Sequence, residues 1–361
     1  MSATLLFIRP LPTVLVALYY YFFLRRAAKF WGAPTEKRWV KILIAVAALL
    51  IGSLMLLLRG MAVLFVLLVM LFGILLDFLH LLLRYPLRKM KLSAVWRCGL
   101  IPVLIAAVLL PYGYFHMRDV RRTTYTVVSE KIGTPYRILF VSDLHFGTAM
   151  DVARLRAYCD EMQETQPDLV VLGGDIVDES TGKEDMQAAF AALGEIESTY
   201  GTYYIFGNHD RATYRRDRLF TQQELETAIL DSGITILRDE RAQAGELTLY
   251  GAEDHSVGSR LSAAELLRDA ENDRFSLLLC HQPRGAEDYA AAGADLMLSG
   301  HTHGGQIWPL GYAVSLISPR YGEYTYGDMT LIVSSGICGW GYAVRTQGVS
   351  EYVIVDLVPA A

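Results

Sequence analysis

The chain has 361 residues, a formal net charge of −5 and a hydrophobic content of 53%, above the share usual for soluble domains. Weak acidity, and the lack of a basic, aromatic-rich stripe in its second part, argue against a nucleic-acid partner. None of the four cysteines is spaced as CxxC, so they predict neither a disulfide framework nor a zinc–thiolate cluster.

The apolar residues are concentrated at the beginning of the chain, and we expect residues 1–118 to form an all-α transmembrane region. A membrane-spanning helix needs about 20 apolar residues. Four segments approach that length: residues 4–24, 42–58, 61–83 and 99–115. The first is the weakest, because it contains an arginine and two prolines. A cleaved signal peptide fits it poorly, since no small-residue cleavage site follows.

Basic residues are unevenly distributed over the connections between these segments. Residues 25–41 carry six Lys and Arg, residues 84–97 carry five, and the connection between the second and third segments has only Arg59. Basic connections tend to stay in the cytoplasm. The pattern therefore predicts a multi-pass protein of the cell membrane whose second part is extracytoplasmic, although three arginines within residues 118–122 argue for the opposite orientation.

Asp77 and His80 lie inside the third segment, three residues apart and therefore on one face of a helix. An ionisable pair within a span is a functional candidate. The alternative, which we favour, is that both lie near enough to the helix end to reach Arg84 or the lipid headgroups.

After a short linker expected at residues 119–135, apolar runs alternate with helical patterns through residues 136–361, which is typical of an α/β domain. Five of the runs end in polar residues. These ends read "DLH" at 143–145, "GGD" at 173–175, "GNHD" at 207–210, a lone His281, and "GHTH" at 300–303. In α/β sheets, ligands bind at the carboxyl ends of strands.

These strand ends supply seven oxygen and nitrogen donors: Asp143, His145, Asp175, Asn208, His281, His301 and His303. Seven donors exceed the needs of one ion but suit two divalent metals that share a bridging carboxylate. Imidazole, carboxylate and amide donors without thiolate favour Mn, Fe or Zn. A bridging hydroxide would be a nucleophile at neutral pH, which indicates attack on a phosphoester. Each cluster alone is a weak signal, but five in this order are specific.

Taken together, the motifs resemble the signature of the calcineurin-like metallophosphoesterases, over residues 137–357. The stretch "GHTHGGQIWP" and the tail from residue 333 are more similar to a bacterial membrane-associated branch of phosphodiesterases. The resemblance implies a four-layer α/β/β/α sandwich with a dinuclear centre between two sheets.

The resemblance also implies roles for single residues. Asp143, His145 and His303 would hold one metal, and Asn208, His281 and His301 the other, with Asp175 as the bridge. His209 would be the acid that protonates the leaving oxygen, and Asp210 would orient His209.

The expected function is that of a membrane-anchored dinuclear-metal phosphodiesterase in which a bridging hydroxide attacks a phosphoester, with a lipid or cell-envelope substrate as a possibility. Two alternatives stay open: a phosphomonoesterase or protein phosphatase, and a non-catalytic metal-binding envelope receptor.

Five further residues have two interpretations each. His255 is more easily explained as a solvated loop residue than as a substrate contact, and Arg345 as a surface group than as a phosphate ligand. Trp308, Trp340 and Tyr342 fit an apolar substrate pocket and a core position equally well.

Overall fold

The structure is a computed structural model that describes residues 10–57, 60–83, 96–211, 218–271, 273–316 and 318–360. The chain forms two compact units, Met1–Gly113 and Tyr114–Ala361. The first contains helices alone among its described residues, and the second contains all the strands.

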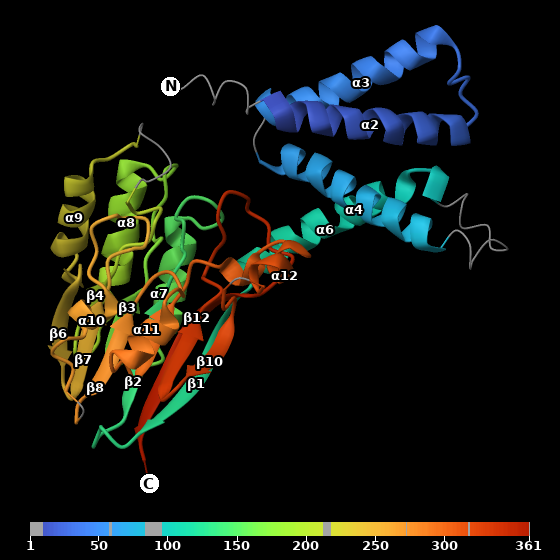
Figure 1. The fold of residues 1–361 in the computed structure, drawn as a ribbon. Coiled ribbons are helices and arrows are strands. Elements are labelled where there is room, and N and C mark those ends of the chain that lie inside the picture. Colours follow the sequence, from blue (N-terminus) through green and yellow to red (C-terminus); the bar gives the residue numbers. More distant parts are fainter. Residues whose placement is uncertain are drawn as a thin grey trace. The chain divides into compact units, whose positions relative to one another are not determined.

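Long helices account for the described part of the first unit (Figure 1). They are α2 (Pro10–Phe30), α3 (Arg38–Leu57), α4 (Met61–Leu83) and α6 (Leu100–Arg118), of which α6 continues into the second unit. Two of them, α4 and α6, are long and apolar enough to cross a membrane. The start of the first expected segment lies outside the described residues, as do Arg59, Arg84 and most of the second basic connection.

Two six-stranded sheets form the centre of the second unit. One has the order β1 (Val120–Ser129), β12 (Ser350–Pro359), β2 (Tyr136–Val141), β3 (Leu169–Leu172), β4 (Thr202–Tyr204), β5 (Ile234–Ile236). The other has the order β10 (Gly322–Tyr326), β11 (Met329–Val333), β9 (Leu296–Ser299), β8 (Phe275–Leu279), β7 (Leu247–Gly251), β6 (Glu240–Ala244). Strands β2 to β5 are parallel, as are β7, β8, β9 and β11, so their carboxyl ends share one edge of each sheet.

The two sheets pack face to face, with helices on both outer sides. Alternate residues of a strand point to opposite faces. Ile138 and Phe140 of β2 therefore join Leu249 and Leu277 in the core between the sheets, whereas Leu139 packs beneath the helices. The outer layers are α7 (Val152–Gln163), α8 (Lys183–Gly194) and α9 (Gln222–Asp231) on one sheet, and α10 (Ala263–Leu266) and α11 (Ala286–Ala291) on the other. The expected four-layer α/β/β/α sandwich is confirmed.

Residues 119–135 differ from the linker expected there, because most of them form strand β1. This strand pairs in parallel with β12 along its whole length, from Val120 opposite Ser350 to Ser129 opposite Pro359. Its run of Val, Thr and Tyr is rich in the β-branched and aromatic residues that favour strands. The strand also contains exposed arginines, which are compatible with its position at the edge of the sheet.

The last turn of α6 is part of the second unit. His116 Nε2 lies 2.9 Å from the carbonyl oxygen of Gly348, and Ser350 Oγ donates to the carbonyl of Met117 over 2.8 Å. The Met117 side chain is buried in the core beside the first sheet. The chain therefore passes from a candidate membrane-spanning helix almost directly into a paired strand.

We predict that β1 is needed for the stability of the second unit. The fragment Lys131–Ala361 would leave β12 as an unpaired edge, and we expect it to melt roughly 5–10 °C below the fragment Asp119–Ala361, which keeps the strand. Differential scanning fluorimetry gives the two midpoints, and gel filtration reports edge-to-edge association. Equal midpoints for the two fragments would show that β1 contributes nothing to stability.

Candidate metal centre

The seven predicted donors follow the carboxyl ends of five parallel strands. Three donor-bearing turns come from the first sheet, after β2, β3 and β4, and two from the second, after β8 and β9. His303 begins a short 3-10 turn, η1 (His303–Gly305), which precedes the five-residue helix α12 (Leu310–Val314). Because the two sheets pack face to face, these turns meet at one edge of the sandwich.

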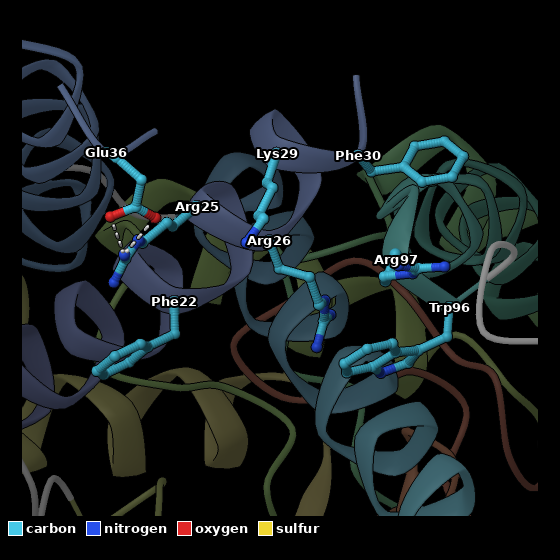
Figure 2. Close-up of a pocket in the computed structure, with 8 residues that line it drawn as sticks. All are labelled: Phe22, Arg25, Arg26, Lys29, Phe30, Glu36, Trp96 and Arg97. Carbon is cyan, nitrogen blue, oxygen red and sulfur yellow. Dashed lines mark hydrogen bonds and ion pairs between the residues drawn. The ribbon is translucent and has the colours of Figure 1, made fainter. Parts of the chain in front are cut away.

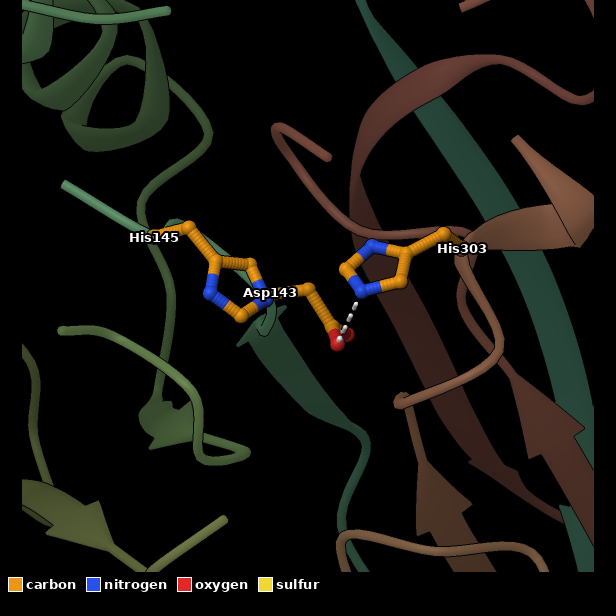
Figure 3. A group of neighbouring side chains, drawn as sticks. All are labelled: Asp143, His145 and His303. Atoms are coloured by element: carbon orange, nitrogen blue, oxygen red, sulfur yellow. Dashed lines mark ion pairs between the residues drawn. The ribbon is translucent and has the colours of Figure 1, made fainter. Parts of the chain in front are cut away.

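Six of the seven donors form two groups, and within each group the potential ligand atoms lie within 4.8 Å of one another. The seventh, Asn208, is buried in the turn that follows β4. One group is Asp143, His145 and His303, which approach from the two sheets (Figure 3). The other is Asp175, His281 and His301. His301 and His303 are thus separated into different groups, as expected, but the backbone between them is a tight turn with positive φ at both histidines and not the extended segment that was expected.

Asp175 lies between the two groups. Its Oδ2 atom is 3.0 Å from His281 Nε2 and 3.7 Å from His145 Nε2, which belongs to the first group. Burial alone would raise the pKa of Asp175, but the His281, His145 and His209 imidazoles hold it well below its usual range. A carboxylate that stays ionised between two sets of donors is suited to bridging two cations.

The donor atoms of this centre fit divalent metal ions, because several are buried without a hydrogen-bond partner. Both ring nitrogens of His145 and Nδ1 of His303 have no hydrogen-bond partner among the described residues, whereas Asp175 Oδ2 and His281 Nε2 face each other over 3.0 Å. Buried polar atoms normally have partners, so unsatisfied ones require a physical reason. Burial lowers the pKa of His301 to about 4 and that of His303 to about 3, which keeps both rings neutral, as metal ligation demands.

Hydrogen bonds to other atoms of the donor side chains fix their orientation. His281 Nδ1 lies 2.8 Å from the carbonyl oxygen of Gly173, which leaves Nε2 directed at Asp175. The Asp143 carboxylate accepts the backbone N–H of His301 over 2.9 Å. Such contacts hold a ligand in its binding geometry before any ion arrives.

The backbone at these strand ends is in the left-handed region. Asp143, His145, Asp175, His301 and His303 have φ angles between 42° and 70°. Non-glycine residues with positive φ are uncommon, and each costs about 1–3 kcal/mol unless the surroundings compensate. This conformation turns the chain sharply after each strand, and it places Asp143 and His145 of one turn in the same group of donors.

His209 faces a carboxylate that the sequence analysis did not identify. Its Nδ1 atom lies 3.0 and 2.9 Å from the two carboxylate oxygens of Glu179, and both side chains are buried. Burial opposes charge on His209, but Glu179 with Asp175 and Asp178 raises its pKa above the usual value. The His209 and His145 rings are 5.0 Å apart, so His209 lies beside the first group of donors.

The prediction that Asp210 orients His209 differs from the structure. The Asp210 carboxylate instead accepts the backbone N–H groups of Asp175 over 2.6 Å, Gly207 over 2.8 Å and Val177 over 3.2 Å. It therefore holds the backbone of two donor-bearing turns, whereas Glu179 is the partner of the His209 ring. Glu179 lies four residues beyond Asp175 in the same turn, and that proximity was the available sequence signal.

Arg345 is neither on the surface nor at a phosphate position. Its side chain is fully buried, and it donates to the carbonyl of His303 over 2.7 Å and to that of Ser335 over 2.9 Å. Burial lowers the pKa of its guanidinium to about 10. Arg345 thus ties the η1 turn to the segment that follows β11.

The aromatic residues are not core. Trp308 and Trp340 are 40% and 49% exposed, and the Trp340 ring lies 5.2 Å from that of His209. Tyr342 is half-buried.

His255 is also half-buried rather than solvated, with its Nδ1 atom 2.6 Å from Arg260 Nη1.

Known proteins resemble this chain over its second unit. The sequence pattern of calcineurin-like phosphoesterases matches residues 136–305. A metallophosphoesterase of Campylobacter jejuni is 34% identical, over 61% of this chain and 59% of that protein. A metallophosphoesterase of Bacillus subtilis is 30% identical, over 67% of this chain and 93% of that protein. A transmembrane protein with a metallophosphoesterase domain from Bos taurus is 28% identical, over 60% of this chain and 51% of that protein. This chain therefore spans less than two thirds of the Campylobacter and bovine proteins.

We predict that a side chain at Gly300 disrupts the first group of donors. An added Cβ would lie 2.2 Å from Asp143 Oδ2 and 2.5 Å from Ser142 Oγ, so Gly300→Ala must displace the Asp143 carboxylate. Plasma mass spectrometry after dialysis at limiting metal should then find about one ion fewer per chain than in the unmodified protein. Gly258→Ala is the matched control, because its added Cβ has no neighbour within 4 Å. An equal metal load in both variants would contradict this assignment.

Proposed function

As this chain belongs to the calcineurin-like phosphoesterase family, we propose that it is a membrane-anchored, metal-dependent phosphodiesterase acting on a lipid-linked phosphoester outside the cytoplasm. The observation that carries the catalytic part is the pair of donor groups with Asp175 between them and His209 at their side. A purely structural metal site does not require a buried, oriented imidazole such as that of His209 next to it.

In this proposal, two divalent ions would be held by the predicted ligands: Asp143, His145 and His303 for one, Asn208, His281 and His301 for the other, and Asp175 for both. Mn, Fe and Zn suit this mixture of imidazole, carboxylate and amide donors. When bound, such ions stabilise the charge that builds on the phosphoryl oxygens and supply a water nucleophile at neutral pH.

The protein's own contribution to the chemistry is proton transfer. Because Glu179 contacts Nδ1 of His209, we propose that Nε2 is the ring atom that faces the substrate. A proton on Nε2 can pass to the leaving oxygen when the P–O bond breaks, and Glu179 stabilises the ring while it is charged. The Trp340 ring lies 5.2 Å from the His209 ring, and we propose that it shields the imidazole from bulk water.

Exposed apolar side chains on the segment that follows η1 support a substrate with an apolar part. The segment of Trp308 lies against the loop that carries Trp340, since Trp308 N donates to Thr346 Oγ1 over 2.9 Å. On the same segment, Tyr312 is 58% and Leu316 86% exposed. Exposed apolar clusters of this kind are typical of surfaces that bind lipid or protein.

The end of the candidate span α6 supports the lipid assignment independently. His116, in its last turn, contacts the carbonyl of Gly348, which belongs to the loop that follows Trp340. The bilayer is therefore within reach of this loop if α6 crosses it. Under this proposal the substrate reaches the site from the membrane surface and need not diffuse through water.

The extracytoplasmic location rests on the basic residues of the first unit. Arg25, Lys29 and Arg97 line one pocket, so the two basic connections approach each other at the same end of the helices. We propose that α3 crosses the membrane together with the candidate span α4, which gives an even number of crossings between the two connections. If this end is cytoplasmic, α6 carries the catalytic unit to the opposite side.

We predict that His209→Ala keeps its metal ions but loses about 10²–10⁴-fold in kcat on a diester with a poor leaving group, as expected for a lost general acid. Glu179→Gln should lose about tenfold or more in kcat with normal metal content, because a neutral amide stabilises the charged His209 ring less. Both losses should shrink on bis(para-nitrophenyl) phosphate, whose leaving group needs no proton.

The control for this pair is Glu184→Gln, which removes an exposed carboxylate of α8 and should change nothing. Loss of metal from the His209 variant would make that residue a ligand. Wild-type kcat in Glu179→Gln on the poor leaving group would remove Glu179 from the mechanism. Faster turnover of para-nitrophenyl phosphate than of the diester would favour a phosphomonoesterase.

We predict that protease added to intact spheroplasts degrades the catalytic unit, because both basic connections are expected in the cytoplasm. Immunoblotting of an epitope placed after residue 360 reports the digestion, and a cytoplasmic marker protein verifies that the cells are intact. Digestion seen only after lysis would place the catalytic unit in the cytoplasm and overturn the proposed orientation.

A further inference from the structure

A pocket of about 530 Å³ lies within the first unit, at the end of α2 and the residues just before α6 (Figure 2). Its volume is within the range of small-ligand sites, about 300–1,000 Å³. The residues that line it are basic or aromatic with one exception: Phe22, Arg25, Arg26, Lys29, Phe30, Glu36, Trp96 and Arg97. Nothing in the proposed phosphoesterase chemistry uses this pocket.

Arg26 forms part of the wall of the pocket, and its side chain is only 18% exposed. Arg26 forms an ion pair with Asp77 of α4, and its guanidinium lies 4.2 Å from the centre of the Trp96 ring. Trp96 Nε1 donates to the same Asp77 carboxylate over 2.6 Å, and the His80 ring stacks on the Trp96 ring with 4.1 Å between their centres. Asp77 and His80, the ionisable pair of the third apolar segment, therefore form a scaffold that fixes Arg26 and Trp96.

The lining of the pocket has an excess of positive charge. Glu36, which lies 3.2 Å from Arg25, is the one carboxylate among the lining residues, whereas Arg25, Arg26, Lys29 and Arg97 are all basic. Asp77, outside the lining, compensates Arg26. In addition, the buried Nε atom of Arg26 has no hydrogen-bond partner among the described residues. Positively charged hydrogen-bond donors that line a pocket are suited to binding an anion.

We propose that this pocket binds the phosphate group of an anionic phospholipid. Arg25, Lys29 and Arg97 would surround the phosphate, and the exposed rings of Phe22 and Phe30 would contact the first carbons of the acyl chains. Basic pockets between membrane helices, at the level of the headgroups, recognise such lipids. The site is distinct from the metal centre, and it belongs to the helical unit alone.

A diffuse attraction is the simpler alternative, because clustered basic residues orient membrane proteins without binding any particular lipid. The two mechanisms differ in which charges matter. A built pocket requires Lys29 and Arg97, whereas diffuse attraction would depend equally on the exposed Lys37 and Arg38, which lie in the same basic connection as Lys29 but outside the pocket.

The test uses the full chain in detergent, titrated with dioctanoyl phosphatidylglycerol and, separately, with dioctanoyl phosphatidylcholine, by isothermal calorimetry. We expect tighter binding of phosphatidylglycerol, and a loss of about tenfold or more in Lys29→Gln/Arg97→Gln. The matched double variant Lys37→Gln/Arg38→Gln removes the same charge and should stay within about twofold of the unmodified protein. Lys29→Arg/Arg97→Lys keeps the charge and should retain binding.

Four results would overturn the proposal. Equal affinity for the two lipids excludes recognition of a net anionic headgroup, and equal losses in the two glutamine variants indicate diffuse attraction. Displacement of phosphatidylglycerol by inorganic phosphate at a similar concentration would make free phosphate, not lipid, the ligand. Unfolding midpoints measured for each variant separate loss of the fold from loss of the site, and failure of binding in the folded charge-keeping variant also counts against the pocket.

Discussion

The Asp210 carboxylate accepts the backbone N–H groups of Asp175 and Gly207, and so joins the turns that follow β3 and β4. It is fully buried, and burial together with the charge of Asp175 raises its pKa to about 6. The desolvation of this group is offset by hydrogen bonds to three backbone donors. Once those turns are joined, the Asp175 side chain is directed between the two donor groups. The N–H of His209 then donates to Asp175 Oδ1 over 2.8 Å.

The fixed position of these turns also explains why backbone strain is found at the donor residues. The left-handed residues of the site directly follow strands whose side chains are almost wholly removed from water. Such strands cannot shift to relieve a neighbouring turn, because their packing on both faces is close. The rigid hydrophobic cores therefore hold the donor residues in their unusual backbone conformation. Gly207 and Gly300 mark places where the backbone almost touches a carboxylate of the site.

The residues that could be predicted from the sequence are those that act through their own chemistry. The donors were found because histidine and aspartate are unusual at the ends of apolar strands unless they bind something, and the sandwich followed from the apolar runs and the family resemblance. Residues that act through distant partners were not found. The roles of Asp210 and Arg345 depend on which backbone groups surround them, and Glu179 is one carboxylate among many until the turn brings it to His209. The pairing of β1 with a strand more than 200 residues away leaves no local signal either.

That last pairing has a consequence for how the protein is made. β1 is the first strand of its sheet to leave the ribosome, and its partner β12 is the last. Since β12 also lies between β1 and β2, the sheet cannot close until β12 has been synthesised. During that interval the helices of the first unit have already left the ribosome, while the second unit is still unfinished. The turns after β2, β3 and β4, which carry Asp143, His145, Asp175 and Asn208, therefore belong to a complete sheet only after its two most distant segments have paired.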